Sequence, residues 1–176
     1  MPKPSSESDH VEIHSAREID MALRNTLEAW FGEEFGHVAY QWAEPDWYVT
    51  VAREGKLAGR LAIVERTIAV GGQLISVGGI AGVATRREWR NRGIASVAMR
   101  AAAGFIARDL RRPFGLLLCR AQVSPVYAKL GWELVEGPTN FIQASGLVTY
   151  PQLTMVMRFG EQSWPIGLID LSGLPW

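Results

Sequence analysis

The chain has only one cysteine, no net charge and no long apolar run. Because Cys119 is alone among 176 residues, an internal disulfide is excluded and nothing calls for an oxidising compartment. The 18 basic and 18 acidic side chains cancel, which leaves no overall field to attract nucleic acid or an anionic membrane. No apolar run reaches the roughly 20 residues that a membrane span needs. We therefore expect a cytoplasmic protein with neither a nucleic acid nor a membrane as its partner.

The size and composition are those of one globular domain. Apolar residues make up 48% of the chain and charged residues 20%, which is ordinary globular usage, and 176 residues can bury a full core. The polar first ten residues do not resemble a signal peptide. We expect residues 1–10 to be disordered and residues 11–176 to form a single domain. Cys119 is interpreted as a small core residue rather than a nucleophile.

The apolar spacing predicts the order β-α-β-β-β-α-β-α-β-β. Ser15 is expected to cap a helix that Gly32 ends, and Gly71-Gly72 is expected to be a hairpin turn between two long strands. The expected strands are 11–14, 48–53, 57–70, 74–84, 114–119, 132–135 and 154–159, and the expected helices are those over 15–31, over 96–110 and from 124 onward.

The most informative segment is Arg90-Asn91-Arg92-Gly93-Ile94-Ala95, between a strand-like run and an amphipathic helix. A loop there aims backbone N–H groups and the positive end of the helix dipole at a bound anion. Gly93 lets the backbone approach closely, because a Cβ would hold the anion off. Arg and Gly are also ordinary loop residues, so the pattern alone is weak. We interpret the segment as a phosphate cradle, and the anion that we expect is the pyrophosphate of a cofactor.

A second segment, Tyr127-Ala128-Lys129-Leu130-Gly131-Trp132, follows the next strand. Together the two segments resemble motifs A and B of the Gcn5-related N-acetyltransferase (GNAT) superfamily. The resemblance implies an α/β (α+β) fold, with a mixed central sheet of about seven strands, splayed between strands 4 and 5, and about four flanking helices. It also implies acetyl-CoA as the co-substrate, with no metal, and a homodimer as one oligomeric state open to the chain.

The resemblance also implies roles for particular residues. Tyr127 matches the tyrosine that protonates the leaving thiolate, which suits a phenol with a pKa of about 10. The cofactor-binding residues that it implies are Val83, Ala84, Thr85, Arg90, Asn91, Arg92, Gly93, Ile94 and Ala95.

Within the superfamily, the chain looks most like the aminoglycoside 2′-N-acetyltransferases, over about residues 27–176. Trp89-Arg90, Gly131-Trp132 and the final tryptophan carry this likeness. It implies that Glu34, Asp170 and the terminal carboxylate of Trp176 bind the substrate. The segment 164–170 resembles, more distantly, the tail of the nodulation N-acyltransferase.

One departure bears on the substrate. The 2′-acetyltransferases carry a glutamate on the fourth strand as the base, and the matching position is Ala81, or Gly82 if the register slips by one. The alternative bases are Glu34, His37, Glu65 and the Trp176 carboxylate. We expect transfer of an acetyl group to an amino-sugar antibiotic, which would confer resistance, with kasugamycin as a candidate because it bears its own acid. The alternatives are another amine (a polyamine, a protein N-terminus or a chitooligosaccharide) and a non-catalytic CoA-binding module.

Overall fold

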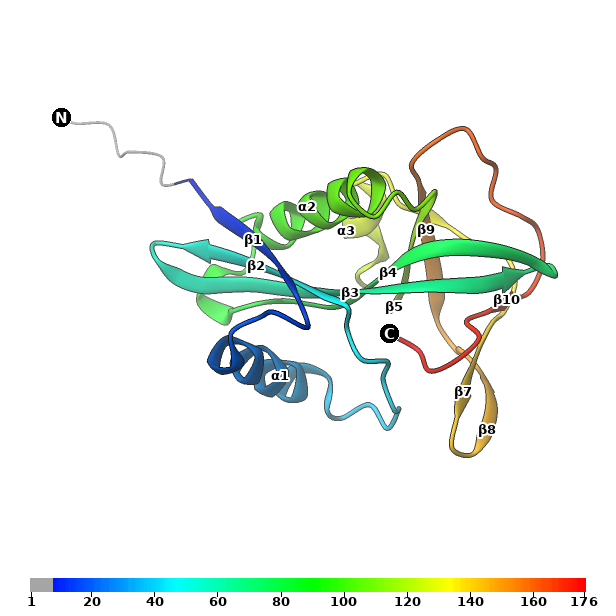
Figure 1. Cartoon of the computed structure of the whole chain (residues 1–176), viewed down its shortest axis with the longest axis horizontal. Helices are drawn as coiled ribbons and strands as arrows, with labels where there is room; N and C mark the ends of the chain where they lie inside the picture. The colour runs from blue at the N-terminus through cyan, green and yellow to red at the C-terminus, as the bar shows by residue number, and fades with distance from the viewer. Residues whose placement is uncertain (1–7) are drawn as a thin grey trace.

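The computed structural model describes residues 8–176, and these form one mixed sheet with helices on both faces (Figure 1). The strands are β1 (His10–Ser15), β2 (Trp47–Arg53), β3 (Lys56–Val70), β4 (Gln73–Thr85), β5 (Phe114–Cys119), β6 (Glu133–Leu134), β7 (Thr139–Gln143), β8 (Gly146–Thr149), β9 (Leu153–Arg158) and β10 (Ile169–Asp170). The helices are α1 (Met21–Phe35), α2 (Ile94–Arg108) and α3 (Ser124–Ala128), with a 3₁₀ turn at Arg87–Trp89. Residues 1–7, where disorder is expected, lie outside the described residues, and His10 is already in β1.

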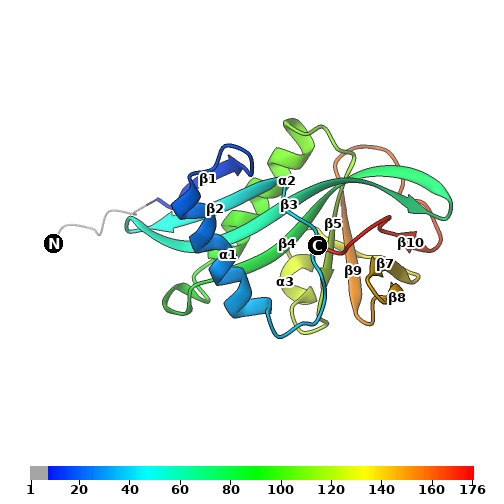
Figure 2. The same ribbon diagram turned by 60° about the horizontal axis from the view of Figure 1, so that its bottom comes forward.

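The predicted fold class is confirmed. The strands run in the order β6-β9-β5-β4-β3-β10-β7-β8, with β1 and β2 continuing from the first half of β3. The β4–β5 and β10–β7 pairs are parallel and the other pairs antiparallel, so the sheet is mixed. Helix α2 packs on β1 to β5, and α1 packs on β4 from the opposite face (Figures 1 and 2). The described residues contain ten strands and three α-helices, where about seven strands and about four helices were expected.

Helix α1 begins later and ends later than predicted. Asp20, not Ser15, is the N-cap, and its side chain accepts a hydrogen bond from the Leu23 N–H at 3.0 Å. The helix then passes through Gly32 and stops at Gly36, so Glu33 and Glu34 belong to its last turn rather than to a loop. A single exposed glycine such as Gly32 lowers helix stability by only about 1 kcal/mol, which the other turns of α1 outweigh.

The long hairpin that leads to the cradle is confirmed. Gly71 and Gly72 have φ values of 55° and 83°, as a two-residue turn with left-handed central residues requires. Further along β4, the register with β3 shifts, because Ala62 pairs with Ala81 and Arg60 pairs with Ala84. One extra residue of β4 is therefore accommodated as a bulge, where Gly82 has a φ of 56°. Beyond the bulge, β4 still pairs with β3 through Ala84 and Thr85, whereas its pairing with β5 has already ended at Ile80.

The apolar C-terminal tail packs on the sheet, as predicted. Trp176 is 4% exposed, and its indole N–H donates to the Leu116 carbonyl at 3.3 Å. A Cβ on Gly79 would lie 2.1 Å from the indole, so glycine at this position of β4 is what lets the ring pack against the strand. Figure 2 shows the C-terminus over the centre of the sheet, on the face that α1 covers.

Candidate functional site

A cavity opens where β4 and β5 separate. Their parallel pairing runs from Val77 and Phe114 to Ile80 and Leu117 and then stops, although both strands continue. Beyond that point, β4 has no strand partner on its β5 side among the described residues, so its backbone groups there are free to bind a ligand. The cavity has a volume of about 320 Å³. Its walls come from α1 and the following loop, β4, β5, α3 and the loop before β9; among the lining residues are Glu34, His37, Ala81, Val83, Cys119, Tyr127, Tyr150 and Trp176.

The predicted cradle has the backbone geometry of an anion site. Asn91 and Gly93 both lie in the left-handed region, with φ values of 60° and 82°, and Gly93 is the N-cap of α2. No side chain caps this helix, so the first N–H groups of α2 remain available for an anion. A Cβ on Gly93 would meet no atom within 4 Å, which leaves open space in front of the loop.

The cradle is held to the sheet by the residues beside it. The Ile94 side chain packs so closely on β3 that a Cβ on Gly59 would lie 2.3 Å from it. Arg53 donates a hydrogen bond to the Arg92 carbonyl at 3.3 Å, and Arg90 donates from Nε to the Thr85 carbonyl at 3.1 Å. These contacts fix the loop before any ligand arrives, which lowers the entropic cost of binding.

Tyr127 lies on the cavity wall beside Cys119. Burial raises the pKa of the Tyr127 hydroxyl to about 12, and the neighbouring Cys119 adds to the increase. The phenol is therefore protonated throughout the physiological range and can act as a proton donor. Cys119 is buried in the core cluster, and burial raises the pKa of its thiol, so it does not have the thiolate character of a nucleophile.

Sequence reasoning missed Tyr150, a second tyrosine on the same wall. Burial also raises the pKa of its hydroxyl to about 12. The signal was weak, because Tyr150 lies between two strands, β8 and β9, of which only β9 was expected.

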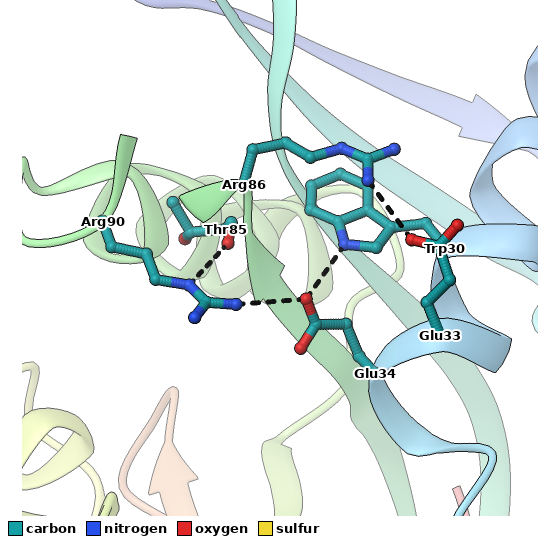
Figure 3. A network of polar contacts seen from close by, with 6 residues as sticks. All are labelled: Trp30, Glu33, Glu34, Thr85, Arg86 and Arg90. Carbon is teal, nitrogen blue, oxygen red and sulfur yellow. Dashed lines mark hydrogen bonds and ion pairs between the residues drawn. The ribbon is translucent and has the colours of Figure 1, made fainter. Parts of the chain in front are cut away.

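Glu34 connects α1 to the cradle (Figure 3). Its Oε1 accepts hydrogen bonds from Arg90 Nη2 at 3.2 Å and from the Trp30 indole N–H at 3.4 Å. The adjacent Glu33 forms a parallel but separate ion pair with Arg86 at 3.5 Å, and the Arg86 guanidinium lies 4.0 Å from the centre of the Trp30 ring. Both ion pairs are partly exposed, so each contributes only about 0–1 kcal/mol to stability.

A second cavity of about 260 Å³ adjoins the first. The two share four lining residues: Phe31, Trp42, Ala81 and Trp176. Ala81 therefore lies at the boundary between the cavities, with a methyl group where the family resemblance implies a carboxylate. The second cavity is also lined by Arg60, a buried residue of β3 that sequence reasoning did not single out.

The structure separates two of the predicted residues from the cavities. Glu65 accepts hydrogen bonds from Arg112 at 2.6 Å and from the Trp47 indole at 2.9 Å, and it lines neither cavity. These partners lower the pKa of its carboxyl group despite burial, so Glu65 forms a structural ion pair with Arg112. Asp170 also lines neither cavity, and its carboxylate accepts a hydrogen bond from the Ser172 N–H at 2.8 Å.

The part of the chain that the structure describes has neither a cluster of potential metal ligands nor a membrane-spanning helix. Within residues 8–176, no three or more His, Cys, Asp or Glu side chains gather as metal ligands would. No helix in the same range is long and apolar enough to cross a membrane.

Comparison with known proteins identifies the family. The model of the acetyltransferase (GNAT) domain matches residues 14–135. An aminoglycoside 2'-N-acetyltransferase from Mycolicibacterium fortuitum is 26% identical over 133 residues. These residues are 74% of this chain and 66% of the relative, so the chain spans slightly less than two thirds of the relative's length.

Solved structures share the fold at low identity. The GNAT-family N-acetyltransferase YhbS from Escherichia coli, in complex with CoA, has a TM-score of 0.62 at 15% identity, covering 97% of this chain and 93% of its own. A GNAT-family acetyltransferase from Brucella melitensis, in complex with acetyl-CoA, has a TM-score of 0.58 at 15% identity, covering 91% and 94%. The family model covers well over half of the chain, and β4 and β5 separate where the family resemblance predicts that the sheet splays. The chain therefore belongs to the GNAT acetyltransferase family.

Proposed function

We propose that this protein transfers an acetyl group from acetyl-CoA to an amino group of an aminoglycoside-type amino sugar. The observation that carries the proposal is the separation of β4 and β5, which opens a cavity lined by Val83, near the end of β4 that leads to the cradle, and by the protonated Tyr127. The amino-sugar acceptor is supported by the likeness to the mycobacterial 2'-N-acetyltransferase. Kasugamycin remains a candidate acceptor, and acetylation of such an antibiotic would confer resistance.

The donor half of the site fits acetyl-CoA. The uncapped start of α2 and the open space before Gly93 suit a pyrophosphate, while Arg90 and Arg92 supply positive charge at its rim. The free backbone of β4 near Val83 is placed to hold the pantetheine arm, because that edge lacks a strand partner. The thioester then lies in the cavity beside Tyr127.

The chemistry forms a C–N bond and breaks the C–S bond of the thioester. The amine must lose a proton and the leaving thiolate must gain one. Tyr127 supplies the second proton from its hydroxyl. With Ala81 in place of a carboxylate, the candidate bases among the residues that line the cavity are Glu34, His37 and, through its terminal carboxylate, Trp176.

The test is an assay of acetyl-CoA with a panel of amino sugars, in which release of CoA thiol and the mass of the product are both measured. We expect a mass increase of one acetyl group on at least one aminoglycoside. If only a polyamine, a peptide N-terminus or a chitooligosaccharide is acetylated, the amino-sugar proposal is wrong and that compound is the acceptor. Binding of CoA without any product would identify a non-catalytic module.

Glu34→Gln is expected to raise the KM for the amino sugar about tenfold, because the variant removes an anion from the cavity wall. The same change frees Arg90 from its ion pair, so the KM for acetyl-CoA should stay the same or fall by about threefold. Steady-state kinetics with each substrate varied in turn measures both effects.

Glu33→Gln is the matched control, because it removes the neighbouring ion pair with Arg86 outside the cavity. It should leave both KM values within about twofold. Equal effects of the two substitutions would show that Glu34 acts only through the surface charge of α1.

A further inference from the structure

Arg60 is a buried cation that forms no side-chain hydrogen bond or ion pair with the residues that the structure describes. Its residue is 2% exposed, and its Nε and Nη1 atoms are buried with no hydrogen-bond partner. The Gly82 bulge admits the guanidinium, since a Cβ there would lie 2.7 Å from Nη1. The guanidinium lies 5.3 Å from the centre of the Phe31 ring, which offers a cation–π contact but no acceptor. Burial lowers the pKa of Arg60 to about 10, and the group is still charged at neutral pH.

The two acidic side chains that line the same cavity, Glu28 and Glu44, interact with residues other than Arg60. Glu28 accepts from Arg24 Nε at 2.7 Å and from the Tyr48 hydroxyl at 3.4 Å, and Glu44 lies 3.6 Å from Arg24. Neither carboxylate forms an ion pair with Arg60 within residues 8–176. Arg24 thus pairs with both acids at the rim. Glu28 still acts on the Arg60 charge electrostatically, but the guanidinium has no ion-pair partner among the described residues.

A buried charge with unused donors is costly in the free protein. Such a cost is offset when a ligand brings the opposite charge. A planar guanidinium with free N–H groups is the side chain best matched to a carboxylate. The position of Arg60 fits that use, because its cavity adjoins the cavity of Tyr127, and Ala81 and Trp176 line both.

We propose that Arg60 binds a carboxylate carried by the acceptor, so that the enzyme acts on amino sugars that bear an acidic group rather than on purely cationic ones. This inference rests on the proposed acetyl transfer to an amino sugar. The acceptor spans both cavities, with its amine beside the thioester and its acid on the buried guanidinium. A purely cationic acceptor would place positive charge against Arg60 at low dielectric, where like charges repel strongly.

The test compares kasugamycin with its methyl ester, two probes that differ in the negative charge of one carboxyl group. Calorimetric titration of the CoA-bound wild type should show about 100-fold tighter binding of the free acid. Arg60→Met should abolish this preference by weakening the acid about 100-fold and the ester by less than threefold. Arg60→Lys, which keeps the charge but loses the fork of donors, should restore part of the preference.

A stability measurement separates this role from a structural one. Because Arg60→Met removes an unpaired buried charge and keeps a similar volume, we expect its Tm to rise by about 2–4 °C. A lower Tm together with unchanged binding of the acid would assign Arg60 to the core alone. The inference is wrong if the wild type binds the acid and the ester equally, or binds neither. It is also wrong if the enzyme acetylates uncharged and acidic amino sugars with equal kcat/KM. In each case the proposed acetyl transfer is still tested by its own assay. Absence of transfer to every amino sugar would instead refute the proposed function.

Discussion

Tyr127→Phe is expected to lower kcat about 100-fold, which is the lower end of what a general acid contributes. The substitution removes one hydroxyl from the cavity wall and keeps the ring that packs against the core. Without the donor, the thiolate must leave as an anion or take its proton from water. The KM for acetyl-CoA should remain within about threefold, because the cradle at the start of α2 is untouched. The measurement is steady-state release of CoA thiol at saturating amino sugar.

Tyr150→Phe is the matched comparison, since both phenols line the same cavity and burial raises the pKa of each to about 12. Tyr150→Phe should keep kcat within about threefold of the wild type. If Tyr150→Phe lost the activity and Tyr127→Phe kept it, Tyr150 would be the proton donor and the motif resemblance would have pointed to the wrong tyrosine.

Gly93→Ala is expected to raise the KM for acetyl-CoA about 30-fold, which corresponds to about 2 kcal/mol of binding. Gly93 has a φ of 82°, and its missing Cβ leaves the space in which we place the pyrophosphate. The alanine methyl group would project into that space and force the anion away from the N–H groups of α2. The left-handed backbone adds a folding cost of roughly 1–2 kcal/mol.

Gly72→Ala controls for that folding cost. Gly72 has a φ of 83°, a Cβ on it would also meet nothing within 4 Å, and it lies in the β3–β4 turn. Thermal denaturation should give similar losses of Tm for the two variants, whereas only Gly93→Ala should change the KM for acetyl-CoA. Equal KM values in both variants would place the pyrophosphate elsewhere.

The backbone geometry of the candidate donor site could be predicted from sequence because it is local. The turn at Gly93, the uncapped start of α2 and the hairpin at Gly71-Gly72 each depend on a few consecutive residues. The hairpin is confirmed, α2 begins two residues earlier than expected, and the pyrophosphate site stays a prediction. Strand β10 was missed because two residues, Ile169 and Asp170, carry no periodicity, and only their pairing with β3 and β7 makes them a strand.

The acceptor half could not be predicted in the same way. Arg60 is the only charged residue between Leu57 and Val64 of β3. This signal is visible in the sequence, but it does not distinguish a residue that binds a ligand from one that lies on the surface. Its burial depends on the β4 bulge at Gly82, and its isolation depends on Arg24 engaging both nearby acids. Asp170 shows the converse, since a motif position predicted a ligand and the fold turned its carboxylate toward Ser172. Long-range register decides the burial of Arg60, whereas a local contact with the Ser172 N–H holds the Asp170 carboxylate.

The distance between the Tyr127 hydroxyl and the sulfur of CoA, in a crystal structure of the complex, tests the central claim most directly. We predict that the sulfur lies between the separated ends of β4 and β5, about 3–3.5 Å from the Tyr127 oxygen, with the pyrophosphate on the N–H groups of residues 92–95. A sulfur atom outside this cavity, or a pyrophosphate bound away from the start of α2, would contradict the account.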